Sequence, residues 1–148
     1  MYRRKKNYYS TFAGYKYSAY KRFATLHPLN FHHRSEVEIR EFIQLYSVCL
    51  QSLTILDTNI TGVIHVLNHD YRKEVLIRYT IDGWSSYTET HAGFSSIVDS
   101  NIDSFCFFLA LPNDMPEGEV CEFCIQYNVQ NVTYWDNNFG QNYKLVWG

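Results

Sequence analysis

The longer part of this 148-residue chain has few basic side chains. Residues 36–148 hold only five Lys or Arg against all fifteen Asp and Glu, which gives a charge of −10. Residues 1–35 hold eight Lys or Arg and no acidic residue, a charge of +8. Binding to DNA or RNA depends on many basic contacts to phosphates. The acidic part is therefore not expected to bind nucleic acid, and only the basic segment could contribute such binding.

Long apolar runs and metal-ligand clusters are also missing. No apolar core follows Met1 and no window approaches the length of a membrane span, so neither a secretory signal nor a span is predicted. The cysteines Cys49, Cys106, Cys121 and Cys124 lack the further close ligands of a zinc site and the strand-to-helix context of a redox motif. We interpret them as buried free thiols in a reducing cytosol, and we expect no metal or other cofactor.

The sequence offers no recognisable catalytic constellation. Asp82 near Trp84 and Asp136 beside Asn137 do not form an acid and base pair of carboxylates. No Ser, Cys or His has an obvious partner for nucleophilic catalysis. An enzyme is therefore not expected.

Residues 1–35 and the segment after them differ in pattern. The first 35 residues are rich in Tyr and Lys without a sustained apolar period, which predicts a basic, flexible tail. The sequence Ser35-Glu36-Val37-Glu38 has the S-x-x-E pattern of a capping box, and apolar residues follow it at spacings of three and four. This predicts a short helix over residues 36–45.

From residue 46 onward the apolar pattern changes to a period of two. Runs rich in β-branched and aromatic residues are separated by turn signals such as "DGW", "PNDMPEG" and "NNFGQN". They predict about eight strands, over residues 46–53, 62–68, 74–80, 86–91, 104–111, 120–129, 132–135 and 143–147. Without helical periods between them, these strands indicate an all-β protein, an immunoglobulin-like antiparallel β-sandwich over residues 46–148.

Large rings stand beside planar amides in "TYWDNNFGQNYKLVW", residues 133–147, and further rings lie in "IDGWSSY", residues 81–87. The C–H face of a sugar ring can rest on an indole, and its hydroxyls can both donate to and accept from amides. The composition thus favours a neutral, hydroxyl-rich ligand. The residues alone leave open the alternative that Asp136-Asn137-Asn138 is an Asx turn and Trp135 a core residue at a strand end. For Trp84, which follows a turn, the functional interpretation is favoured.

The stretches "VLIRYTIDGWSSY" and "TYWDNNFGQNYKL" resemble the family 21 carbohydrate-binding module, which occurs in glycogen-targeting regulatory subunits of protein phosphatase 1 and in some fungal glucoamylases. The similarity covers about residues 46–147, and its W-D-N-N-x-G-x-N-Y motif is specific. It implies an immunoglobulin-like sandwich that binds glycogen or starch, an α-1,4-glucan, without catalysis. The implied role is a cytoplasmic, glycogen-associated targeting or scaffold subunit.

The resemblance also implies roles for individual residues. Trp84 and Trp135 would be stacking platforms, and the residues that bond sugar hydroxyls would be Asn68, Asp136, Asn137 and Asn142. A second, candidate carbohydrate site would be formed by Tyr71, Lys73 and Phe94. Where starch-binding relatives carry a further ring in the strand "EFCIQY", this chain has Cys124, which predicts a smaller main platform.

The implied partners are glycogen or another α-glucan, the catalytic subunit of protein phosphatase 1 and glycogen synthase. The phosphatase docking motif of the relatives, a basic residue, then Val or Ile, any residue, and Phe or Trp, is not found. Residues 34–39 come nearest, but acids flank Val37 and Ile39 stands where the aromatic residue should be. Two hypotheses stay open: a glucan-binding targeting or scaffold subunit, and a phosphatase adaptor with another docking segment within residues 1–45 that also recruits glycogen-metabolising enzymes.

Overall fold

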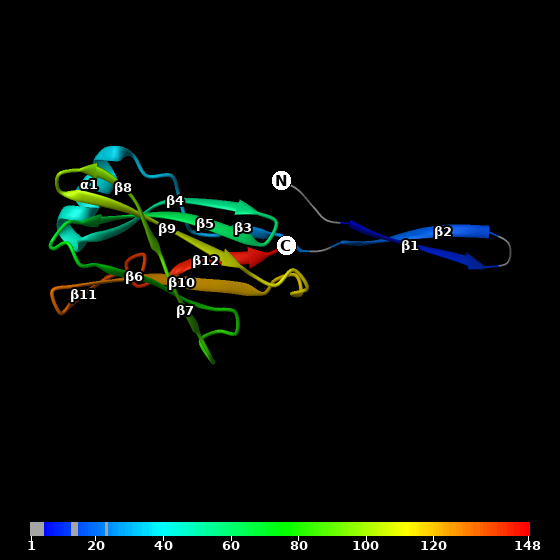
Figure 1. Ribbon diagram of the computed structural model, residues 1–148. Coiled ribbons are helices and arrows are strands. Elements are labelled where there is room, and N and C mark those ends of the chain that lie inside the picture. Colours follow the sequence, from blue (N-terminus) through cyan, green and yellow to red (C-terminus); the bar gives the residue numbers. More distant parts are fainter. Residues whose placement is uncertain (1–4, 13–14, 23) are drawn as a thin grey trace.

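The structure, a computed structural model, describes residues 5–12, 15–22 and 24–148, and two antiparallel sheets form its body (Figure 1). The six-stranded sheet has the order β3 (Leu26–Pro28), β12 (Tyr143–Trp147), β10 (Val120–Val129), β6 (Glu74–Thr80) and β7 (Thr88–His91), with β11 (Val132–Asp136) also paired to β10. The four-stranded sheet has the order β4 (Val48–Leu56), β5 (Asn59–Leu67), β9 (Ile102–Ala110) and β8 (Gly93–Asp99). Strands β1 (Lys5–Phe12) and β2 (Tyr15–Arg22) pair antiparallel with each other.

The core lies between these two sheets because alternate residues of each strand point inward. On β10 the buried residues are Phe123, Ile125 and Tyr127, and on β5 they are Ile60, Ile64 and Val66. Gly62 takes the remaining inward position of β5, where an added Cβ would overlap the ring of Phe107. The predicted β-sandwich is thus confirmed, and its outer faces stay free to carry polar and aromatic side chains.

Helix α1 (Glu36–Tyr46) corresponds to the helix predicted over residues 36–45. Its N-terminus has the predicted capping box, in which Ser35 Oγ accepts a hydrogen bond from Glu38 N and Glu38 Oε1 accepts one from Ser35 N, both at 3.2 Å. The helix ends at Ser47, which has a φ of 71° and donates its N–H to Ile43 O at 2.8 Å. Ile39 and Ile43 are buried and anchor the helix to the sandwich.

Residues 24–34 do not behave as the flexible tail that the sequence predicts up to residue 35. Strand β3 pairs with β12, and Leu26 N donates to Asp57 O at 3.0 Å. Arg34 donates to Leu50 O at 2.8 Å. This segment is held by backbone pairing, by the buried Leu26 and by single contacts of Asn30 and Arg34. It has no periodic apolar face, so hydrophobic patterning could not reveal it.

All eight predicted strands overlap a strand of the sandwich, but two sandwich strands and the β1–β2 pair were not predicted. Strand β8 reads "GFSSIVD" and lies at the edge of the four-stranded sheet with nearly every residue exposed. An edge strand without a buried face has no apolar alternation to detect. Strand β3 has only three residues, too few for a periodic pattern.

Candidate functional site

The outer face of the six-stranded sheet carries exposed aromatic rings. Trp84 and Tyr87 lie in the connection between β6 and β7, and Trp135 lies on β11. Tyr87 is 54% exposed and Trp135 is 38% exposed, while Trp84 is partly buried. The ring centroids of Trp84 and Tyr87 are 6.5 Å apart. These side chains offer flat apolar surface of the kind that a sugar ring can cover.

A tight turn places Trp84. Its backbone φ is 71°, an unusual value for a bulky side chain, and its N–H donates to Thr80 Oγ1 at 3.1 Å. The Asp82 carboxylate closes the turn by accepting hydrogen bonds from Ser86 Oγ at 2.6 Å and Ser86 N at 2.9 Å. These bonds, with one from Thr80, hold the pKa of Asp82 below its ordinary value. Asp82 therefore stabilises the turn that presents Trp84.

Glu122 links this turn to the Asn-rich turn after β11. Its Oε1 atom accepts a hydrogen bond from Trp84 Nε1 and another from Asn142 Nδ2, both at 3.3 Å. Glu122 lies on β10 between the buried residues Cys121 and Phe123, so its side chain points to the outer face. Glu122 was not among the site residues predicted from the sequence. Its outward position in the alternating strand "VCEFCIQYNV" was the available signal.

Asp136, the last residue of β11, points into the protein and has a fully buried side chain. Its Oδ2 atom accepts hydrogen bonds from Leu50 N at 2.7 Å and from the Tyr143 hydroxyl at 2.6 Å, and Arg34 Nη1 lies 3.9 Å away. Burial raises the pKa of the Asp136 carboxyl, against these bonds, which lower it. Because the side chain has no exposed surface, the structure contradicts its predicted role as a ligand for sugar hydroxyls.

The Asn-rich turn over residues 137–142 accounts for much of the W-D-N-N motif. Asn137 Oδ1 accepts from Gly140 N at 2.9 Å, and Asn142 N donates to Asn137 O at 2.7 Å. Positive φ angles, which glycine and asparagine adopt most readily, occur in this turn at Asn138, Phe139, Gly140 and Asn142. Asn137 is exposed, and Asn142 directs its amide toward the Glu122 carboxylate beside Trp84. The turn thus brings Asn142 to the rings.

Asn68 makes no direct bond to these residues within the described part of the chain. It belongs to the connection between β5 and β6, where its backbone N–H donates to Asn101 O at 2.7 Å. Within residues 24–148 no hydrogen bond or ring contact joins Asn68 to Trp84 or Trp135. The predicted role of Asn68 as a ligand for sugar hydroxyls therefore stays a prediction.

The three residues predicted for a second site do lie together. A hollow of about 590 Å³ is lined by Tyr71, Arg72, Lys73, Ala92, Phe94, Asp103 and Phe105. Tyr71 is 96% exposed, and the exposed ring of Phe94 packs edge-on against Phe105. Lys73 is almost fully buried, with its Nζ atom 3.0 Å from Asp103 Oδ2. The ion pair of Lys73 with Asp103 therefore forms part of the wall of this hollow. The exposed rings of Tyr71 and Phe94 offer the surface that a ligand could contact.

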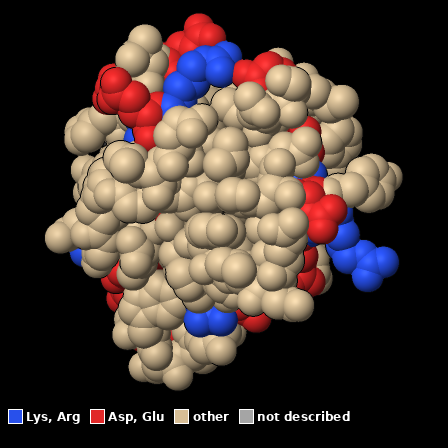
Figure 2. All heavy atoms as spheres, turned by 90° about the vertical axis from the view of Figure 1, so that its left-hand side faces the viewer, with Lys and Arg blue, Asp and Glu red and all other residues tan. Residues whose placement is uncertain are grey.

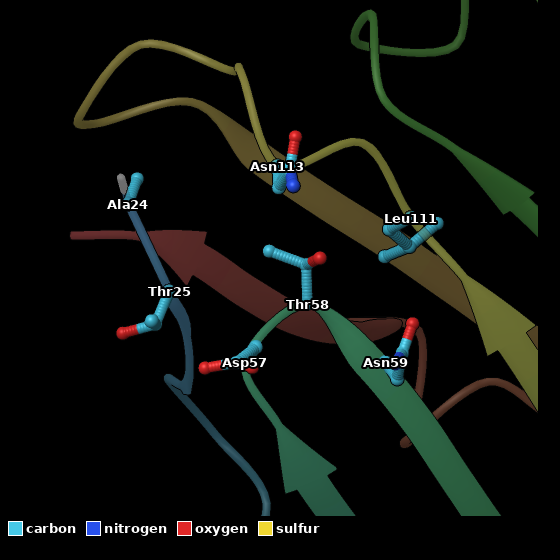
Figure 3. A pocket seen from close by; sticks show the side chains of 7 residues that line it. All are labelled: Ala24, Thr25, Asp57, Thr58, Asn59, Leu111 and Asn113. Atoms are coloured by element: carbon cyan, nitrogen blue, oxygen red, sulfur yellow. The ribbon is translucent and has the colours of Figure 1, made fainter. Parts of the chain in front are cut away.

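A smaller pocket of about 170 Å³ lies elsewhere, between the segment before β3 and the β4–β5 turn (Figure 3). No aromatic residue lines it, and the oxygen atoms of Asp57 and Asn59 point in different directions (Figure 3). Asp57 Oδ1 is buried and has no hydrogen-bond partner among the described residues. The pocket lacks the rings and the converging polar groups that a sugar would require.

Charged side chains are unevenly distributed over one end of the sandwich. Figure 2 shows the end of the sandwich on the left of Figure 1, where a broad uncharged centre is surrounded by Lys, Arg, Asp and Glu.

Burial raises the pKa of the Cys49 and Cys121 thiols to about 12 and that of Cys124 to about 11, so these thiols are protonated at neutral pH. Across the described residues there is no group of three His, Cys, Asp or Glu placed to hold a metal ion. In the same part of the chain, no helix has both the length and the apolar character of a membrane span.

Comparison with known proteins places the chain among carbohydrate-binding domains. The model of the carbohydrate/starch-binding module (family 21) matches residues 43–146. Protein phosphatase 1 regulatory subunit 3C of Bos taurus is 37% identical over 112 residues, which cover 74% of this chain and 35% of that protein. Protein phosphatase 1 regulatory subunit 3B of Homo sapiens is 34% identical over 112 residues, covering 74% of this chain and 39% of that protein. The chain therefore spans little more than a third of the length of these relatives.

Two solved structures are similar as well. The carbohydrate binding module of the muscle glycogen-targeting subunit of Protein Phosphatase-1 superimposes with a TM-score of 0.69 at 31% identity, covering 83% of this chain and 91% of that one. The starch binding domain of Rhizopus oryzae glucoamylase, solved in complex with beta-cyclodextrin and maltoheptaose, gives a TM-score of 0.53 at 30% identity, with coverage of 67% and 92%. Both similarities support the sandwich architecture described above.

The burial of Asp136 predicts a structural role that stability measurements can detect. Asp136→Ala leaves Leu50 N–H and the Tyr143 hydroxyl without their acceptor and Arg34 without its counter-charge, so we expect urea denaturation to show a loss of about 3 kcal/mol in the free energy of unfolding. Gln141→Ala, at an exposed position in the following turn, is the control and should change that free energy by less than about 0.5 kcal/mol. An Asp136→Ala protein as stable as the unmodified chain would contradict the structural role.

Proposed function

The chain belongs to the family 21 carbohydrate-binding modules, and on that basis we propose that it is a non-catalytic module that binds α-1,4-glucan such as glycogen or starch. The observation that carries the proposal is the placement of Trp84. A left-handed backbone costs such a residue roughly 1–3 kcal/mol, and strain of this kind concentrates at functional sites. Here the strained turn holds the indole beside the outer face, with its N–H on Glu122.

The chemistry of the ring face suits a neutral polymer of sugars. Trp84 and Trp135 would stack on the C–H faces of glucose units, and the exposed amide of Asn137 would exchange hydrogen bonds with their hydroxyls. Asn142 would serve both Glu122 and a sugar hydroxyl, since an amide has two donors and an acceptor. None of these contacts requires the ligand to carry charge, which agrees with the acidic body of the protein.

The second hollow, lined by Tyr71, Lys73 and Phe94, is proposed as a weaker glucan contact. Its two exposed rings give apolar surface without the dense amides of the first site. A shallow site of this kind binds weakly on its own, because few hydroxyls are fully desolvated and paired. Linked to the first site on one domain, it would raise avidity for a polymer that offers many chains.

The relatives are regulatory subunits of protein phosphatase 1, so we propose that the chain is a glycogen-associated targeting or scaffold subunit of the cytoplasm. Recruitment of the phosphatase catalytic subunit, with glycogen synthase as a further partner, is the second candidate function. The closest match to the docking motif, residues 34–39, is folded into the cap and first turn of α1, with Ile39 buried. An extended docking peptide is therefore not available there, and a docking segment would lie elsewhere.

The stacking role of the tryptophans is tested by Trp84→Ala and Trp135→Ala. Loss of one platform should lower the affinity for glycogen about thirtyfold, or about 2 kcal/mol, in co-sedimentation assays with maltoheptaose as competitor. Phe108→Ala, which removes an exposed ring from the outer face of the other sheet, is the control and should bind like the unmodified protein. Unchanged binding by both well-folded tryptophan variants would contradict the proposed site.

The second hollow predicts a difference between polymer and oligosaccharide. Tyr71→Ala should reduce binding to glycogen by up to about 100-fold, because the second contact acts intramolecularly, while affinity for a short maltooligosaccharide changes little. Co-sedimentation and calorimetry measure the two quantities on the same protein. Equal losses on both ligands, or none on either, would leave Tyr71 without a role in a second site.

Removal of residues 1–23 separates the two candidate functions. Strand β3 begins at Leu26 and β1 pairs with β2, so the shortened chain retains every strand of the sandwich and should bind glycogen within about twofold of the full chain. If the chain recruits the phosphatase catalytic subunit through residues 1–23, capture of that purified subunit should disappear with them. Capture that survives the truncation, or loss of glycogen binding, would contradict this division of roles.

A further inference from the structure

Arg78 of β6 occupies the space between two of the exposed rings. Its guanidinium carbon lies 4.6 Å from the centroid of the Tyr87 ring and 5.3 Å from that of Trp135. Its Nε donates to Glu89 Oε2 at 3.0 Å, and its Nη2 lies 2.9 Å from the same oxygen. The sheet register places Arg78 directly opposite Glu89 on β7 and opposite Cys124 on β10. The guanidinium is thus held on the outer face beside the edge strand β7.

Folding alone does not account for this arrangement. The Arg78 side chain is 29% exposed and that of Glu89 is 35% exposed, and ion pairs with such access to water contribute little to stability. Glu89 engages Nε and Nη2, so the Nη1 amino group is not taken up by this pair. A planar cation stacked on rings, with donors to spare and a carboxylate beside it, is equipped to bind hydroxyl groups.

We propose that Arg78 and Tyr87 join Trp84 and Trp135 into one continuous binding strip, along which a glucan of several units lies. This inference rests on the proposed glucan binding. The order along the strip is Trp84, Tyr87, Arg78 and Trp135, with the Trp84 and Tyr87 rings 6.5 Å apart and Arg78 between Tyr87 and Trp135. Arg78 contacts the sugar with its free donors and also fixes the rings on either side of it.

The ion pair keeps this strip suited to a neutral ligand. Two nitrogen atoms of the positive Arg78 contact the same oxygen atom of the negative Glu89. The pair therefore adds no net charge to the strip. Together they present donors and an acceptor side by side, which matches the dual character of a sugar hydroxyl. Glu89 therefore acts as a positioning residue that holds the guanidinium in its stacked orientation.

A continuous strip predicts that affinity depends on the length of the glucan. Maltose, with two units, can cover only one part of the strip, whereas maltoheptaose can cover all of it. In calorimetric titrations, Arg78→Leu should lower the affinity for maltoheptaose about tenfold while the affinity for maltose stays within about twofold. Arg78→Lys should show the same loss, because a compact ammonium cannot stack between two rings as the planar guanidinium does.

Two further variants complete the experiment. Tyr87→Ala removes an exposed ring and should reproduce the length-dependent loss, which keeps the test decisive if Arg78→Leu does not fold. Arg40→Leu breaks a comparable exposed ion pair, with Asp99 at 2.8 Å on the α1 side of the molecule, and should bind both sugars normally. The strip would be overturned if Arg78→Leu and Tyr87→Ala lowered the affinities for maltose and maltoheptaose equally, or if neither variant lowered the affinity for maltoheptaose. If the unmodified chain does not bind maltoheptaose, the proposed function itself fails.

Discussion

The buried carboxylate of Asp136 is the group on which the rest of the site depends. It is bonded by Leu50 of β4 and by Tyr143 of β12, and Arg34 approaches it from the segment before α1. Arg34 and Leu50 are 16 residues apart, whereas Arg34 and Tyr143 are 109 residues apart, so one side chain ties the two sheets to the N-terminal segment. A buried carboxylate is tolerated only when such donors surround it, and removing any of them leaves a costly unpaired group.

The alternation of side chains along a strand relates the buried Asp136 to the exposed rings. Because side chains alternate along β11, burial of Asp136 directs its neighbour Trp135 to the outer face. The same rule on β10 places Glu122 outside between the buried residues Cys121 and Phe123. The carboxylate of Glu122 then meets Trp84 and Asn142, which arrive from two separate turns. The ring face is therefore a consequence of core packing, and its platforms need no deep pocket to hold them.

Much of the fold could be predicted because periodicity is a local signal. The eight predicted strands and the capped helix follow from alternation and from the S-x-x-E pattern. Strand β8 and the attachment of residues 24–34 depend instead on edge pairing and on single contacts such as that of Arg34. Within the proposed site, the platform roles of Trp84 and Trp135 stay predictions, and composition could not separate a ligand role of Asp136 from its buried one. The predicted role of Asn68 stays a prediction, because its position relative to the rings is set by topology rather than by sequence spacing.

The two proposed contact regions come from different parts of one β-sandwich. Trp135 lies on the six-stranded sheet and Trp84 in a connection between two of its strands, whereas Tyr71 follows β5 and Phe94 lies on β8, both strands of the four-stranded sheet. A single short oligosaccharide gains little from such separation, but a branched polymer can present one chain to each region. Shallow surfaces would then suffice, because the second contact would form at the high local concentration set by the first. The acidic body does not oppose this binding, since a neutral glucan experiences no electrostatic repulsion from it.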